Sequence, residues 1–99
     1  MGDITHYLLS DIAEVDIGDI YDYTLGSHSM AKAALYLTGM DKVFGQIVEQ
    51  PKIGKLRPEI RESLRSFQYE HHTVFYRVMD DHIRIVRVLH SSRDMPRHF

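Results

Sequence analysis

Cationic side chains are concentrated near the C-terminal end of the chain, and they are the residues best suited to act on a partner or a substrate. Arg84, Arg87, His90 and Arg93 run through the last strand-like segment into a polar tail. Arginine is enriched at the energetic centres of protein interfaces, and histidine transfers protons near neutral pH. We therefore expect the functional residues to lie at this end of the chain.

Four arginines and one histidine have two interpretations each. Arg65, Arg77, Arg87 and Arg93 are either surface residues that pair with nearby acids, which contributes little to stability, or anchors for a partner protein. His90 is either a satisfied residue at the end of a strand or a functional one. The family motif described below favours Arg87 and Arg93 as anchors.

Metal and cofactor sites are not expected. The chain has no cysteine, and it has no glycine-rich loop of the kind that binds phosphate. His71 and His72 are adjacent in an extended segment, so their side chains should point to opposite faces and cannot chelate one ion together. We expect no metal and no cofactor.

Length and composition indicate one small domain, residues 1–99, with one modest core. The absence of cysteine is compatible with a reducing cytosol. The sequence contains neither a secretory signal nor an apolar run of about 20 residues that would span a bilayer. We therefore expect a soluble cytoplasmic protein without a membrane segment.

Charge is distributed unevenly along the chain. Residues 1–50 hold two cations and eight acids, whereas residues 51–99 hold ten cations and six acids. A protein that binds nucleic acid by itself usually has a broadly basic surface, and the total net charge here is −2. Direct binding of nucleic acid is therefore not expected, although a local basic face is.

The elements that position the C-terminal cations are predicted to be strands. Residues 73–79 are rich in β-branched and aromatic side chains, Asp80-Asp81 forms a turn, and residues 83–89 return as the second strand of a hairpin. Residues 64–70 alternate as a half-buried strand, which places Arg65 on the same face as two aromatic residues. The polar connection 51–63 precedes this strand.

Two helices are predicted in the first half, after a short strand over residues 4–9. Ser10 or Asp11 can cap the first helix, and Ser27 or Ser29 can cap the second, which should end before Pro51. Apolar residues recur at three- and four-residue steps in both segments. The helices should therefore form an antiparallel pair that lies on a sheet.

The predicted fold is α+β, with the order β-α-α-β-β-β and two antiparallel helices packed on one face of a small, antiparallel-rich sheet of four strands. Residues 83–90 alternate with mixed character on both faces, so their parity does not tell which face the helices cover. The other face should stay partly open and apolar, with the arginines on it. A partner is expected to cover that face.

The C-terminal half resembles the ParE branch of the ParE/RelE toxin superfamily, and the resemblance extends over nearly the whole chain. A tyrosine-bearing strand, an acidic turn and a final strand reading close to Arg-Val-Leu-His, followed by Arg-Asp, are typical of that branch. The matching residues are Tyr76, Asp80-Asp81, Arg87-Val88-Leu89-His90, Arg93-Asp94, Ile20, Tyr23-Thr24, Phe44, Gln50-Pro51, Gly54 and Leu64-Arg65-Ser66.

The resemblance implies the toxin of a type II toxin-antitoxin system, a plasmid stabilisation protein. A toxin of this branch inhibits DNA gyrase, requires no cofactor and is not an enzyme, and a co-expressed ParD-like antitoxin neutralises it in a hetero-oligomer. The residues expected to bind the target or the antitoxin are Arg65, Tyr76, Arg77, Arg87, His90 and Arg93. Acidic residues of the antitoxin would complement the arginines.

Two alternatives remain open. The RelE branch cleaves mRNA on the ribosome, which requires a base, an acid and cations that stabilise the phosphorane. Arg65 and His90 would form that site with a carboxylate from Glu62 or Glu70. However, Ser91-Ser92 replace the tyrosine or histidine pair usual there, and the lysine-rich helix end of that branch is reduced to Lys52 and Lys55. The second alternative is an interaction module that has lost its toxicity.

Overall fold

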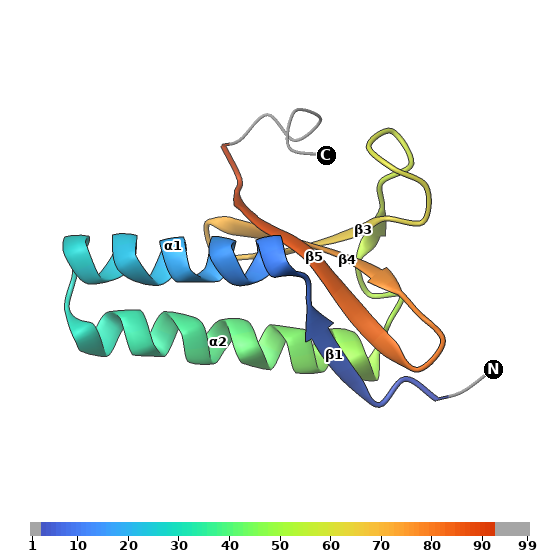
Figure 1. Ribbon diagram of the computed structural model, residues 1–99, viewed down its shortest axis with the longest axis horizontal. Helices are drawn as coiled ribbons and strands as arrows, with labels where there is room; N and C mark the ends of the chain where they lie inside the picture. The colour runs from blue at the N-terminus through green and yellow to red at the C-terminus, as the bar shows by residue number, and fades with distance from the viewer. Residues whose placement is uncertain (1–2, 93–99) are drawn as a thin grey trace.

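The structure is a computed structural model, and it describes residues 3–92. Arg93 lies outside the described residues. The predicted α+β architecture and the order of its elements are confirmed. One strand precedes the two helices, and the other strands of a mixed sheet follow them (Figure 1). The elements are β1 (His6–Leu9), α1 (Asp11–Ser27), α2 (Met30–Glu49), β2 (Lys55–Leu56), β3 (Arg65–Tyr69), β4 (His72–Val78) and β5 (His82–His90).

The sheet has five strands in the order β1-β5-β4-β3-β2, rather than the predicted four. The additional strand, β2, consists of two residues within the polar connection and pairs with the start of β3. Its length explains why no alternation revealed it in the sequence. Only β1 and β5 are parallel; the other neighbours are antiparallel, as expected for an antiparallel-rich sheet.

Serine side chains cap both helices. The hydroxyl of Ser10 accepts a hydrogen bond from the Ala13 amide, and the hydroxyl of Ser29 accepts one from the Lys32 amide, each at 3.1 Å. These bonds satisfy amides that have no partner within the helix. The helices lie side by side as a hairpin, and the end that connects them extends beyond the sheet (Figure 1).

The main core lies between the helices and one face of the sheet, as predicted. Each helix contributes a stripe of apolar residues, and β4 and β5 contribute the opposing wall. Residues of this type and spacing drive the packing because their apolar surface leaves water. The buried residues are Ala13, Ile20, Met40, Val43, Phe44, Ile47, Val74, Tyr76, Ile83, Ile85 and Val88.

A β-bulge in β5 explains why its alternation is mixed. Phe75 of β4 pairs with Arg87, but the next residue, Tyr76, pairs with Ile85, so Val86 is an extra residue in the ladder. An extra residue reverses the alternation of side chains between the two faces. Ile85 therefore faces the helices before the bulge, and Val88 faces them after it.

The opposite face of the sheet, called the reverse face below, is partly open, as predicted, but the prediction that a partner must cover its apolar surface is wrong for one half. Leu64, Phe75 and Leu89 are buried there, and Ile60 from the 57–64 connection packs against them. The guanidinium carbon of Arg57 also lies 6.0 Å from the centre of the Phe75 ring. The connection thus supplies the cover that was expected from a partner.

Candidate functional site

Tyr76 is a core residue rather than a contact for a partner. Its side chain is completely buried. Its hydroxyl donates a hydrogen bond to the Pro51 carbonyl at 2.7 Å and accepts one from the Gly54 amide at 2.8 Å. The expectation that Tyr76 binds the target or the antitoxin therefore does not fit its position; the residue anchors the loop between α2 and β2.

Arg65 serves the same loop. It pairs with Tyr76 across β3 and β4, so it lies on the face covered by the helices and not on the reverse face. Its guanidinium donates to the Gly54 carbonyl at 2.8 Å and, at 3.5 Å, to the Lys52 carbonyl. Arg65 is therefore engaged by the chain itself.

The three residues expected for ribonuclease chemistry do not converge. Arg65 begins β3, whereas His90 ends β5 and is aligned, through His72, with the far end of β3. Four residues of a strand span about 13 Å. Glu62 lies in the 57–64 connection, outside all strands. An acid, a base and a cation must surround one phosphate, and this set does not.

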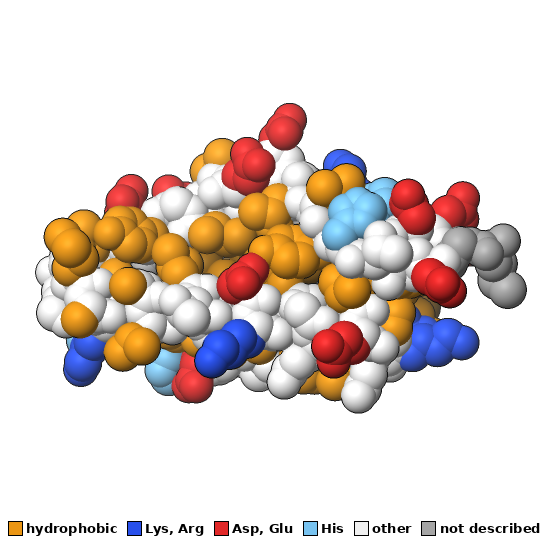
Figure 2. All heavy atoms as spheres, turned by 90° about the horizontal axis from the view of Figure 1, so that it is seen from below, with side chains coloured by type: hydrophobic (Ala, Val, Ile, Leu, Met, Phe, Trp, Pro, Cys, Tyr) orange, Lys and Arg blue, Asp and Glu red, His pale blue; other side chains and the backbone are white. Residues whose placement is uncertain are grey.

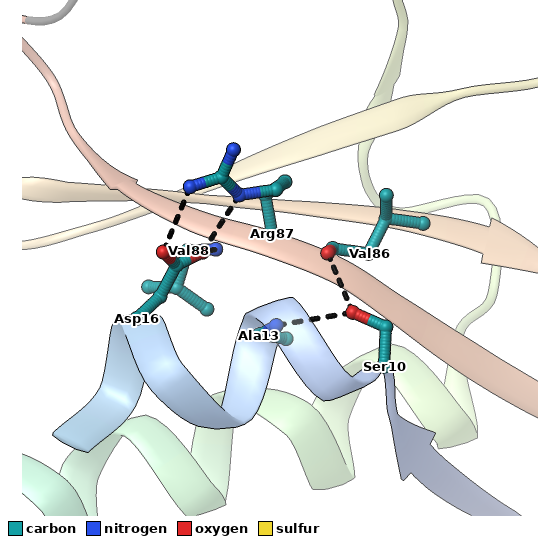
Figure 3. A network of polar contacts seen from close by, with 6 residues as sticks. All are labelled: Ser10, Ala13, Asp16, Val86, Arg87 and Val88. Atoms are coloured by element: carbon teal, nitrogen blue, oxygen red, sulfur yellow. Dashed lines mark hydrogen bonds and ion pairs between the residues drawn. The ribbon is translucent and has the colours of Figure 1, made fainter. Parts of the chain in front are cut away.

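Arg87 is held by α1. Its Nε and Nη2 atoms donate to the two carboxylate oxygens of Asp16, each at 2.9 Å (Figure 3). Both side chains are largely buried, with 15% of Arg87 and 10% of Asp16 exposed. The hydrogen bonds to Asp16 raise the pKa of Arg87 further. The pair is a structural contact that joins the helix to the sheet.

The same region of α1 completes the edge of β5. Strand β1 ends at Leu9, so the rest of β5 has no strand on that side. Instead, the Asp16 carboxylate accepts the Val88 amide at 3.0 Å, and the Ser10 hydroxyl donates to the Val86 carbonyl at 2.8 Å (Figure 3). Buried backbone groups need such partners, and here a helix supplies them.

Arg77 and Arg84 have a different environment. They are directly opposite each other on β4 and β5, and both are exposed on the reverse face. Neither makes an ion pair or a hydrogen bond within the part of the chain that the structure describes. Arg77 was expected from the sequence to bind a partner; Arg84 was noted there only as one of the C-terminal cations.

A large groove separates the projecting helices from the sheet. It has a volume of about 1150 Å³ and is lined by α1, the first half of α2, the turn between β3 and β4, and the end of β5. Three tyrosines contribute to it, namely Tyr23, Tyr36 and Tyr69. Tyr69 approaches α2 closely because Gly39 has no side chain, and its hydroxyl donates to the Tyr36 carbonyl at 2.9 Å.

Large apolar side chains are exposed around this groove. Tyr23 is 76% exposed and Leu35 is 71% exposed, and both line it. Figure 2 views the molecule from below the orientation of Figure 1. It shows apolar side chains gathered along the helical hairpin, from the tip that extends beyond the sheet to the middle of the molecule. Exposed apolar surface on this scale indicates an interaction surface.

Comparison with known proteins shows what this arrangement belongs to. Residues 7–95 match the sequence model of the family described as the ParE toxin of the type II toxin-antitoxin system parDE. The chain belongs to the ParE toxin family. A match of this length includes every helix and nearly every strand residue, so the resemblance noted from the sequence is confirmed.

Individual relatives of this ParE family member agree with the family match. Toxin ParE1 of Mycobacterium tuberculosis is 34% identical over 94 residues, which cover 94% of this chain and 96% of the relative. Toxin ParE1 of Caulobacter vibrioides is 33% identical over 92 residues, covering 93% and 95%. A solved chain described as the chromosomal ParDE TA system from P. aeruginosa has a TM-score of 0.76, at 19% identity, and covers 89% and 96%; it supports the fold alone.

Three histidines of this ParE family member meet at the groove. The His72 ring lies 5.3 Å from that of His90, and the His71 ring lies 6.4 Å from it. The Tyr36 hydroxyl is 2.5 Å from Nδ1 of His72. The prediction that His71 and His72 face opposite sides is therefore wrong: His71 belongs to the turn, where strand alternation does not apply.

Burial, together with smaller contributions from the neighbouring His90 and His71, lowers the pKa of His72 to about 4. A histidine with a lowered pKa in the fold favours folding while it is neutral. This contribution is complete above the unfolded pKa of about 6.5 and is lost as the pH falls towards 4. We expect the loss to be about 1 to 2 kcal/mol, since the ring is only half-buried.

The measurement is the free energy of unfolding in urea between pH 7 and pH 4. In the wild type the free energy of unfolding should decrease as the pH falls, and replacing His72 with glutamine should remove part of that decrease. The matched control is His28→Gln, on the exposed connection between the helices, which should keep the wild-type slope. Equal slopes for the wild type and His72→Gln would show that this ring does not carry the effect.

The described residues contain neither a membrane-spanning helix nor a metal-binding cluster. No helix among them is long and apolar enough to cross a bilayer. Within residues 3–92, no group of three or more histidine or carboxylate side chains is arranged to hold a metal ion.

Some residues around the groove were not identified from the sequence as site residues. Asp16 belongs to no sequence motif. It bonds to β5 because β1 ends at Leu9 and leaves the rest of that strand edge without a neighbouring strand. Tyr36 and Tyr69 occupy positions that the sequence pattern assigns to the core. Their place at the groove became evident only from the contact of Tyr69 with Gly39. The like-charged pair on β4 and β5 was detectable in principle, because a hairpin register counted from Asp80-Asp81 aligns Arg77 with Arg84.

Proposed function

We propose that this protein is a toxin that binds DNA gyrase, arrests it on cleaved DNA, and is kept inactive by a ParD-like antitoxin. The family match carries the proposal, because it extends over almost the whole chain. The toxin acts in the cytoplasm by binding and not by covalent chemistry. In support, the residues that ribonuclease chemistry would need lie apart in the fold.

The groove between the helices and the sheet is the proposed site for a helix of the antitoxin. Its exposed tyrosine and leucine side chains fit the mode in which an amphipathic helix places its apolar face in a groove. Tyrosine is also enriched among residues that dominate binding energy. The complex is therefore a hetero-oligomer in which the antitoxin covers apolar surface that the free toxin exposes.

Gyrase and supercoiled plasmid test the first half of the proposal. Adding the purified protein should cause linear DNA to accumulate, and adding the cognate antitoxin should prevent this. A reaction without gyrase is the control. No effect on gyrase, together with cleavage of mRNA on translating ribosomes, would support the ribonuclease alternative; neither effect, with antitoxin binding intact, would support a non-toxic interaction module.

Variants of the groove test the second half. The double variant Tyr23→Ser/Leu35→Ser should bind the antitoxin at least about tenfold more weakly, because both side chains are exposed there and lose their contacts. The matched control is Val15→Ser, which is 60% exposed on α1 and does not line the groove. Equal affinity of the double variant and the control would place the antitoxin elsewhere.

A further inference from the structure

The open part of the reverse face carries an unusual row of side chains. Register aligns Arg77 of β4 with Arg84 of β5, and Arg84 with Leu8 of β1. All three are exposed, Leu8 by 50%. We call these three residues the arginine row. It lies beyond the segment that the 57–64 connection covers.

The two arginines are not placed there for stability. Like charges directly opposite each other on a sheet face are destabilising. Two other arginines of the sheet are compensated: Arg87 by Asp16, and Arg65 by carbonyl groups. Arg77 and Arg84 have no such compensation among residues 3–92, so an anion bound from outside would relieve their repulsion.

We propose that the arginine row binds an extended, acidic peptide segment that lies across the exposed strands, with an apolar side chain on Leu8 and carboxylates on Arg84 and Arg77. The inference rests on the proposed function, since the antitoxin is the partner that would supply this segment. The site is separate from the groove, which is lined by the two helices, the turn between β3 and β4 and the end of β5. None of the three residues of the arginine row lines the groove.

The spacing of the row fits a peptide. Adjacent strands are about 4.8 Å apart, so the row is about 10 Å long. Alternate side chains of an extended peptide project to one side at intervals of about 6.7 Å. An apolar residue followed by acids two and four positions later therefore spans the row, and the flexible arginines adjust to the remaining difference. Guanidinium and carboxylate groups also form bidentate hydrogen bonds.

Nucleic acid fits the row less well than a peptide. A DNA backbone requires a stripe of several cations, whereas this row has two, next to an apolar side chain. The row is therefore too short and too apolar for a nucleic-acid backbone, and a short peptide fits it better.

Labelled peptides test the inference with the full-length protein at low salt. The probe is a nine-residue peptide with leucine followed by glutamates two and four positions later, and its control has glutamine in place of glutamate. The wild type should bind the acidic probe at least about tenfold more tightly than the control. The variant Arg77→Gln/Arg84→Gln should lose this preference, yet be at least as stable to heat, since the repulsion is gone.

The matched control variant is Lys42→Gln/Lys52→Gln, which removes the same charge from exposed positions outside the groove and should keep the preference. Equal binding of both peptides, or an unchanged preference in the arginine variant, would overturn the inference. Arginine-dependent binding of a 20-base-pair DNA duplex in place of the peptide would also overturn it. None of these outcomes alters the gyrase and groove experiments, so the two proposals can fail separately.

Discussion

Replacing Asp16 with alanine is expected to lower the free energy of unfolding by about 3 kcal/mol, a large fraction of the roughly 5 to 15 kcal/mol that stabilises a typical domain. The carboxylate binds the Arg87 guanidinium through two hydrogen bonds and also accepts the Val88 amide. Its removal leaves a mostly buried cation and a strand amide without this acceptor. Leaving such groups unsatisfied costs more than the intact pair contributes.

Urea unfolding measures the effect, and the chain offers a matched control on the same helix. Asp19→Ala removes an exposed carboxylate one turn later and should change stability by less than about 0.5 kcal/mol. The double variant Asp16→Ala/Arg87→Met should recover part of the loss, because the buried cation is also removed. If Asp16→Ala behaved like Asp19→Ala, the contact between α1 and β5 would not be a stabilising one.

Replacing Gly54 with alanine is expected to cost about 3 kcal/mol. A Cβ atom at this position would lie 2.6 Å from the Tyr76 hydroxyl, 2.7 Å from its ring and 2.9 Å from the Ser66 carbonyl. Tyr76 is completely buried, and the Ser66 atom is backbone, so neither can move aside cheaply. The glycine is required for this close approach and not for its backbone conformation, because it has no positive φ.

The control for Gly54→Ala is Gly45→Ala in α2. No atom lies within 4 Å of a Cβ built there, so alanine should stabilise the helix by up to about 1 kcal/mol. Thermal unfolding should therefore shift in opposite directions for the two variants. A Gly54→Ala protein as stable as the wild type would mean that the loop adjusts and that the hydrogen bonds to Tyr76 are not tightly constrained.

Helices and paired strands could be predicted because their signals are local. Serine caps, helical periodicity and the Asp80-Asp81 turn each lie within a few residues of the element they define. The two-residue β2 has no room for a pattern, and it was missed. The mixed alternation in β5 also did not show which face of the sheet the helices cover. It results from the bulge at Val86, which depends on pairing with β4 and not on local sequence.

The candidate site could be predicted only in part, because the role of an arginine depends on contacts far along the chain. Arg65, Arg77 and Arg87 had the same two interpretations in the sequence, and the family motif favoured Arg87 as an anchor for a partner. In the fold, Arg65 binds a loop and Arg87 binds α1. The partner of Arg87 is 71 residues away. Tyr76 was chosen through a family motif, but its side chain is completely buried in the core.

The completion of the β5 edge by α1 has a consequence for a toxin before its partner arrives. A bare strand edge is a template on which identical chains can stack into fibrils. Here the second half of β5 bonds to Ser10 and Asp16, so no further strand can be added there. The outermost strands, β1 and β2, are only four and two residues long, which gives neighbouring copies little backbone on which to assemble.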